Sequence, residues 1–197
     1  LWDSSFGITT AQDPKASPAG DNSLFYTLPT IVDDVALTAS YSPSGKLKGA
    51  SSSYGIGYIG VEGLAVNYAI GSDDTTTGST ADVDTLKATY AYGSITVGYS
   101  TTEYDSESVD TSADQEVESF NVSYTVSENI SISYGTETIS EPMDTADQDI
   151  DVSGVTASYT SGGMTITGTM IDADNTDMTT STTADKQQWS LAASFAF

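Results

Sequence analysis

The sequence contains no histidine, cysteine or arginine, and each absence removes a class of function. Without histidine there is no imidazole for acid–base catalysis or for a Ser-His-Asp triad. Without cysteine there are no disulfides and no thiolate metal sites. Five lysines stand against 28 acidic residues, a net charge of −23, whereas nucleic-acid binding requires many basic contacts to phosphates. We therefore predict that the protein is not an enzyme and does not bind nucleic acid.

Long apolar runs are also absent, and none approaches the roughly eighteen residues of a membrane-spanning helix. A membrane-spanning β-strand alternates apolar and polar residues and is only mildly hydrophobic on average, so this absence does not exclude a membrane. The chain shows alternation with a period of two and no segment with a helical period. The sequence therefore predicts an all-β antiparallel meander.

The last nine residues alternate most clearly. Large apolar side chains occupy every second position, namely Trp189, Leu191, Ala193, Phe195 and Phe197. Small residues occupy the positions between them: Ser190, Ala192, Ser194 and Ala196. Tilted by about 40°, such a strand covers roughly 20 Å of a barrel axis, close to the ~25 Å apolar band of an outer-membrane barrel. The pattern favours a transmembrane strand; the alternative is the closing strand of a soluble β-sandwich.

The same alternation recurs upstream in five pairs of runs, each pair joined by a short turn. The pairs are 24–28 with 35–41, 54–58 with 64–70, 86–92 with 95–99, 120–126 with 130–134, and 155–159 with 164–170. With the last strand they make eleven. Longer acidic links separate the pairs, as external loops do in outer-membrane barrels. Because a carboxylate is costly in lipid, we expect the acidic residues to be confined to these links.

The residues on the two faces of the strands predict what each face of the sheet contacts. Tyrosines beside short turns and the terminal aromatics are typical of a membrane-facing girdle. The predicted girdle consists of Tyr58, Tyr92, Tyr124, Tyr159, Trp189, Phe195 and Phe197. Serine, threonine, glycine and asparagine dominate the opposite face, which predicts an aqueous interior. Lys87 falls on that face between Thr85 and Thr89, so it is the candidate for a charge lining a pore.

Asp172, Asp174 and Asp177 form the one candidate metal site, because oxygen ligands at nearly alternate positions suit Ca²⁺. The segment lacks the central glycine and the distant glutamate of an EF-hand loop. A solvated acidic loop is the alternative interpretation. No other cofactor is expected.

Two segments carry a resemblance to a known family. Asn22-Ser23-Leu24-Phe25-Tyr26-Thr27-Leu28-Pro29 and Ala36-Leu37-Thr38-Ala39-Ser40-Tyr41-Ser42-Pro43-Ser44-Gly45, together with the meander and the terminal Phe197, resemble the general diffusion porins of Gram-negative outer membranes. In that family such a strand follows the loop that folds into the barrel and narrows it. The resemblance implies a transmembrane antiparallel β-barrel, with this chain as strands 6 to 16 of sixteen. The alternative is a complete twelve-stranded barrel that has an extra strand over residues 2–8.

The resemblance also divides the chain and suggests partners. Residues 1–22 would be a segment like the constriction loop, and residues 23–197 the meander that forms the barrel wall. The charged candidates in the first segment are Asp3, Asp13, Lys15 and Asp21. The resemblance further implies a homotrimer in the bacterial outer membrane, in contact with the lipid bilayer and lipopolysaccharide.

The predicted function is a passive channel for small hydrophilic solutes and ions. The acidic balance favours cations, because carboxylates at the mouths concentrate cations within a Debye length of about 8 Å. The alternative is a secreted, acidic, Ser/Thr-rich β-protein that acts as a Ca²⁺-dependent adhesin or surface-layer protein. That class would more often show Gly-Asp-rich repeats, which are not evident in the sequence.

Overall fold

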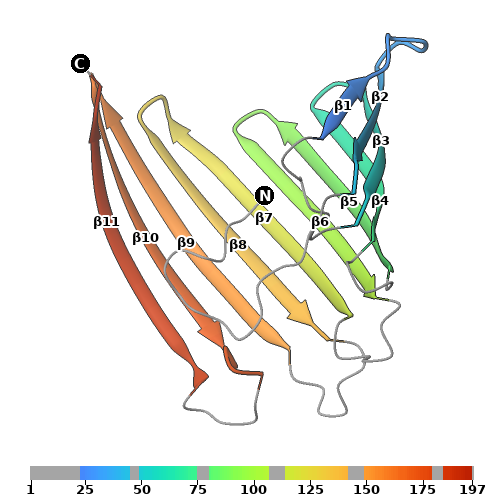
Figure 1. Ribbon diagram of the computed structural model, residues 1–197. Helices are drawn as coiled ribbons and strands as arrows, with labels where there is room; N and C mark the ends of the chain where they lie inside the picture. Colours follow the sequence, from blue (N-terminus) through green and yellow to red (C-terminus); the bar gives the residue numbers. More distant parts are fainter. Residues whose placement is uncertain are drawn as a thin grey trace.

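A computed structural model describes residues 23–44, 49–74, 80–106, 114–141, 149–178 and 184–196. Eleven strands in these residues form one sheet in chain order, each antiparallel to the next (Figure 1). They are β1 Leu24–Thr27, β2 Val35–Ser42, β3 Ser51–Val61, β4 Leu64–Asp74, β5 Thr80–Tyr92, β6 Ile95–Ser106, β7 Gln115–Ser127, β8 Ile130–Ser140, β9 Ile150–Ser161, β10 Met164–Asp174 and β11 Lys186–Phe195. The predicted all-β meander and its eleven strands are confirmed.

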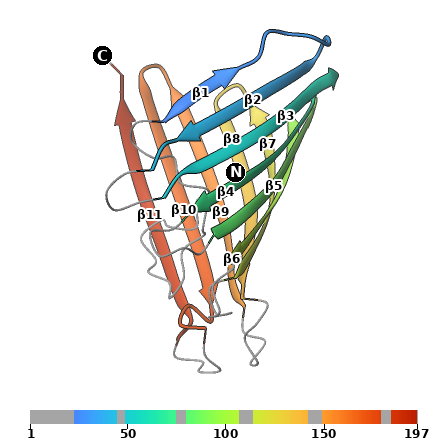
Figure 2. The same ribbon diagram turned by 45° about the vertical axis from the view of Figure 1, so that its right-hand side comes forward.

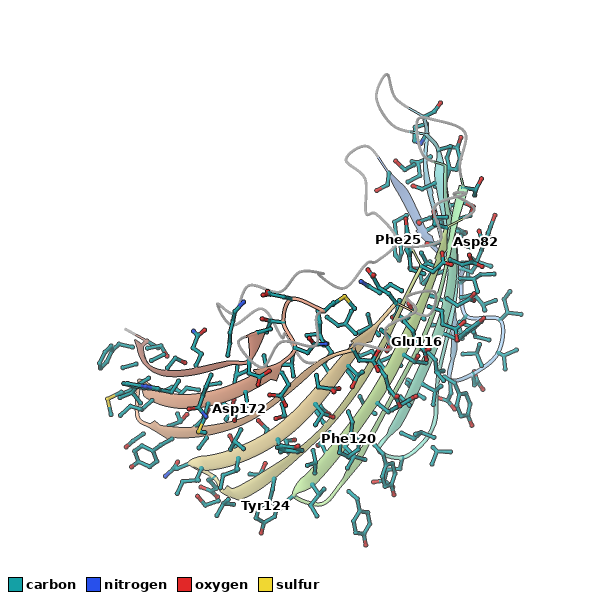
Figure 3. All side chains as sticks on the ribbon, turned by 90° about the horizontal axis from the view of Figure 1, so that it is seen from below. Phe25, Asp82, Glu116, Phe120, Tyr124 and Asp172 are labelled. Atoms are coloured by element: carbon teal, nitrogen blue, oxygen red, sulfur yellow. The ribbon has the colours of Figure 1, made fainter. Side chains whose placement is uncertain are left out.

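The sheet is strongly curved and its strands are tilted relative to one another (Figure 2). Seen end-on, it forms an open arc with a concave and a convex face (Figure 3). This curvature follows from the right-handed twist of extended chains, which accumulates from strand to strand. Within the described residues, no helix has the length and apolar character needed to cross a membrane.

Tight turns join the strands at one end of the sheet, and glycine makes three of these turns possible. Gly63, Gly93 and Gly162 have φ values of 77°, 58° and 60°. Hairpins of this length require the left-handed region at a central position, and glycine enters that region without steric cost. We call this the short-turn end, and the opposite end, which carries the acidic links, the long-link end.

The strands extend further toward the long-link end than the sequence predicted. β5 to β10 contain between 11 and 13 residues each. Acidic residues assigned to the links therefore lie within strands: Asp82, Asp84, Glu103, Asp105, Glu116, Glu118, Asp151, Asp172 and Asp174. The expectation that carboxylates are confined to the links was wrong. At this end the apolar residues move from convex to concave positions. A search for strands with apolar residues on the convex side therefore stops too early.

The buried core lies on the concave face at the long-link end. Six of its side chains, from four neighbouring strands, pack together, and we call them the concave apolar cluster: Val117, Ile139, Ile150, Val152, Ile171 and Ala173. Over the rest of the sheet the large apolar side chains lie on the convex face and are exposed. The sheet is therefore apolar outside over most of its height and apolar inside at one end.

Substitution of Gly63 tests the geometry of the short turns. A Cβ atom there would fall on the carbonyl oxygen of Ala91, whereas a Cβ at Gly162 meets nothing within 4 Å. Gly162→Ala therefore adds only the left-handed backbone cost of about 1–2 kcal/mol, and we expect Gly63→Ala to lower the free energy of unfolding by clearly more. Refolding titrations in urea and detergent measure both variants, and equal losses would show that the contact with Ala91 is unimportant.

Candidate functional site: the two faces of the sheet

The convex face carries the aromatic residues that the sequence assigned to a girdle. Tyr58, Tyr92, Tyr124 and Tyr159 are exposed and lie near the short-turn end, with Tyr124 on the convex side of the arc in Figure 3. Trp189 and Phe195 of β11 are exposed as well, and Phe197 lies outside the described residues. The positions suit a girdle, and the contact of these rings with lipid stays a prediction.

A second set of convex aromatic residues lies further from the short turns and was not singled out from the sequence. Its members are Tyr54, Tyr68, Tyr99, Phe120 and Tyr134, all exposed. The Tyr68 hydroxyl donates a hydrogen bond of 2.7 Å to Oδ1 of Asp84. An aromatic ring whose hydroxyl reaches a charged group suits the boundary between an apolar band and water. Two aromatic levels therefore bracket the apolar band, as in outer-membrane barrels.

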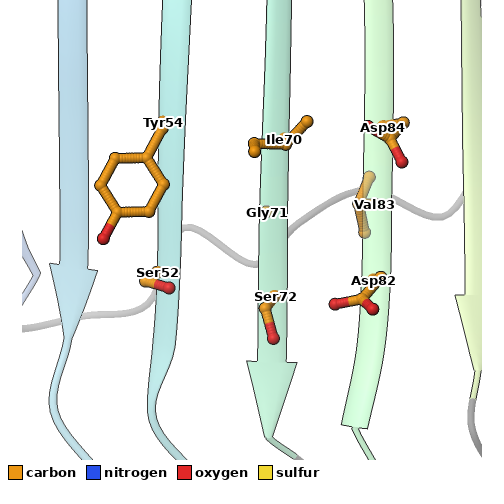
Figure 4. Close-up of a pocket in the computed structure, with 8 residues that line it drawn as sticks. All are labelled: Ser52, Tyr54, Ile70, Gly71, Ser72, Asp82, Val83 and Asp84. Carbon is orange, nitrogen blue, oxygen red and sulfur yellow. The ribbon is translucent and has the colours of Figure 1, made fainter.

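Carboxylates occupy the convex face beyond the second aromatic set, and we call them the acidic belt: Asp82, Asp84, Glu103, Asp105, Glu116, Glu118, Asp151, Asp172 and Asp174. Its members face one another across neighbouring strands: Asp82 pairs in register with Asp105, and Asp84 with Glu103. Like charges placed directly opposite are destabilising, so this part of the sheet requires water or counter-ions rather than lipid. A hollow of about 340 Å³ between β3, β4 and β5 lies at the boundary, with Tyr54 and Ile70 above Asp82 in Figure 4.

The concave face is lined by hydroxyl groups that pair across adjacent strands. Oxygen–oxygen distances are 2.7 Å for Ser40 and Ser53, 3.1 Å for Thr85 and Thr102, 3.2 Å for Thr156 and Thr169, 3.1 Å for Ser158 and Thr167, and 3.0 Å for Thr160 and Thr165. Each hydroxyl both donates and accepts, so a paired hydroxyl retains capacity for water. Below the concave apolar cluster, the concave face is therefore a wall of hydroxyl groups that can hydrogen-bond water.

Charge on this wall is sparse. Among the strand side chains that the structure describes, concave positions hold three charged residues: Lys87 of β5, Glu137 of β8 and Lys186 of β11. Lys87 is exposed and lies in register with Asn67 and Ser100, on the face that the sequence predicted. Most of the strand-borne carboxylates lie on the other side of the sheet, in the acidic belt.

Glu137 was not predicted as a site residue. It is 5% exposed, and its Oε2 accepts a 3.0 Å hydrogen bond from the Ser119 hydroxyl. Its Oε1 is buried and has no hydrogen-bond partner in the described structure. Ser131 and Ser133 lie on the concave face, and the same alternation carried on through Gly135 places Glu137 on this wall. The predicted strand ends at Tyr134, so the prediction from sequence did not reach Glu137.

The remaining sequence candidates do not gather into a site in the described structure. Asp3, Asp13, Lys15 and Asp21 lie outside the described residues. Asp172 and Asp174 lie on the convex face of β10, and the Gln187 amide donates a 2.6 Å hydrogen bond to Asp172. Asp177 follows in the next turn. In the described ranges no three acidic side chains are arranged to hold a metal ion, so the calcium expectation gains no support.

An antiparallel meander with an apolar, aromatic-bracketed convex face and a hydroxyl-lined concave face is the wall of an outer-membrane β-barrel. A family model described as Gram-negative porin matches residues 1–141, and the chain belongs to this family. The resemblance seen in the sequence is thereby confirmed, as is location in the bacterial outer membrane. A search of curated proteins finds no match.

Solved outer-membrane barrels share the fold. The outer-membrane expressed OmpT of Vibrio cholerae superimposes with a TM-score of 0.64 at 15% identity, over 88% of this chain and 62% of that chain. An anion-selective porin from Comamonas acidovorans gives a TM-score of 0.64 at 14% identity, over 88% of this chain and 56% of that chain. The chain thus spans less than two thirds of each, and the eleven described strands match part of a larger barrel.

Adjacent positions on β11 test the assignment of faces. Leu191 is 72% exposed on the convex face, and Ser190 alternates with it on the concave face. If the convex face meets lipid, Leu191→Arg costs about 2–4 kcal/mol at mid-membrane, while Ser190→Arg costs much less. Refolding titrations into lipid bilayers measure both free energies of folding, and equal costs would mean that the faces are assigned wrongly.

Proposed function

We propose that the protein is a passive outer-membrane channel for small hydrophilic solutes and ions, and not an enzyme. The hydroxyl-lined concave wall carries this proposal. A wall of serine and threonine hydroxyls hydrogen-bonds water and polar solutes without binding any one of them tightly. Solutes then pass by diffusion, and the width of the bore sets the size limit. The exposed apolar convex face supports contact with the bilayer.

The sparse charge on the concave wall supports only weak discrimination between cations and anions. The expected cation preference rested on the net charge, yet the strand-borne carboxylates lie mainly in the acidic belt, outside the wall. The concave positions described hold two lysines and one buried glutamate. The cation expectation therefore gains no support from the structure, and we propose that this part of the wall discriminates little between cations and anions. The structurally similar porin from Comamonas acidovorans is anion-selective.

A homotrimer and contacts with lipopolysaccharide belong to the proposal and rest on the family resemblance. The adhesin or surface-layer alternative gains no support, because an exposed apolar face bracketed by aromatic residues suits a lipid environment.

Conductance and reversal potential test this function. In planar bilayers under a KCl gradient, we expect the porin that contains this chain to give stepwise conductance and a small reversal potential. Lys87→Glu inverts a charge on the wall, so the reversal potential should shift toward cation preference. Asp84→Asn is the matched control, because Asp84 lies in the acidic belt on the outside of the wall and is screened by salt.

Absence of conductance steps from the folded protein would contradict a channel. A shift with Asp84→Asn as large as that with Lys87→Glu would contradict the assignment of the concave face to the bore.

A further inference from the structure

The hollow between β3, β4 and β5 on the convex face has two chemically different sides. Two neighbouring rows of side chains line it, and the register of the strands fixes their order (Figure 4). The row nearer the short turns consists of Tyr54, Ile70 and Asp84, and the row nearer the long links consists of Ser52, Ser72 and Asp82. Small serines beside a row of larger side chains leave the space that forms the hollow.

The side of the hollow toward the apolar band suits an acyl chain. Tyr54 is 60% exposed and Ile70 is 44% exposed. The Tyr68 hydroxyl donates to Asp84 at the same level, as a ring does where acyl chains end and head groups begin. A molecule that fills the hollow therefore has an apolar part on this side.

The opposite side of the hollow attracts a cation. Asp82 and Asp84 lie two residues apart on β5, and their register partners on β6 are Asp105 and Glu103. The two lysines that the structure describes take concave positions, so neither neutralises these carboxylates. The two serines of the hollow add hydroxyl groups, which both donate and accept hydrogen bonds. A cationic group that donates several hydrogen bonds therefore complements this side.

The volume and the oxygen atoms of the hollow limit the ligand further. Small-molecule sites occupy about 300–1,000 Å³, so a hollow of about 340 Å³ takes a head group and not a whole lipid. A primary ammonium group has three N–H donors, as the lysine side chain does, whereas a quaternary ammonium group has none. The carboxylate and hydroxyl oxygens of the hollow therefore favour a primary ammonium group.

We propose that this hollow seats the head group of a lipid that carries a primary ammonium group, of the phosphatidylethanolamine type. The ammonium group donates hydrogen bonds to Asp82 and Ser72, and the first part of an acyl chain packs on Tyr54 and Ile70. The phosphate accepts from the Ser52 hydroxyl, two strands or about 10 Å from Asp82. The seat lies on the outside of the barrel wall, so this inference goes beyond the proposed channel function.

Native mass spectrometry tests the proposal on the porin that contains this chain, in detergent with equal amounts of dioleoyl-phosphatidylethanolamine and dioleoyl-phosphatidylcholine. We expect the wild-type protein to retain the first lipid about tenfold more than the second, whose trimethylated head group donates no hydrogen bonds. Asp82→Asn removes the charge and should bring the two lipids close to equal retention. Asp172→Asn is the matched control, because Asp172 belongs to the acidic belt on β10 but does not line the hollow.

Ser72→Leu separates shape from charge. It fills the hollow without changing a charge, so it should also remove the preference, and it gives the same readout if Asp82→Asn fails to fold. Equal retention of both lipids by the wild-type protein overturns the proposal, as does a wild-type preference in folded Asp82→Asn or Ser72→Leu. A loss as large in Asp172→Asn overturns it as well, because the charge of the whole belt would then be responsible.

A chelator distinguishes the proposed ammonium contact from a metal bridge. Retention of the phosphatidylethanolamine should not change when EDTA is added. Release of the lipid by EDTA would show that a divalent cation joins a lipid phosphate to the carboxylates, and this result also overturns the proposal.

Discussion

The alternation of side chains between the two faces of each strand is the constraint on which this structure depends. From β2 to β11 the ladders are antiparallel and nearly continuous in register, so a face assigned on one strand is assigned on all. Tyr90, Val97 and Val122, for example, follow one another across β5, β6 and β7 on the convex face. A slip of one residue in any ladder would bring tyrosines and aliphatic residues into the bore, and the different surroundings of the two faces resist such a slip.

The two faces exchange their character near the long-link end, and this exchange explains where the charge lies. Carboxylates take convex positions at this end of β5, β6, β7, β9 and β10, while aliphatic residues of β5, β7, β8, β9 and β10 take concave positions and are buried. A strand that continues beyond the apolar band meets water on its outer side, where carboxylates are stable. Its inner side can then carry a small core, provided that another part of the chain covers it. Met178, which follows β10, packs against this core.

The alternation was sufficient to predict the number of strands, the short turns and the direction of each face, because each depends on neighbouring residues. It failed where the phase inverts. Asp82-Val83-Asp84 and Glu116-Val117-Glu118 alternate as regularly as the tyrosine strands do, but with the aliphatic residue facing inward. Because these segments are acidic, a prediction from sequence assigns them to links and not to strands. The burial of Glu137 against Ser119 and the packing of Met178 join segments that are distant in sequence, which a local pattern cannot contain.

We infer that tyrosines and aliphatic residues face lipid while hydroxyl residues face water. The absence of cysteine allows single cysteines to be placed at four consecutive positions of β9, from Val155 to Ser158, and probed in folded protein in lipid vesicles. We expect a water-soluble thiol reagent to label positions 156 and 158, and lipid-dissolved quenchers to affect a fluorophore at positions 155 and 157. The reverse pattern, or no alternation, would contradict it.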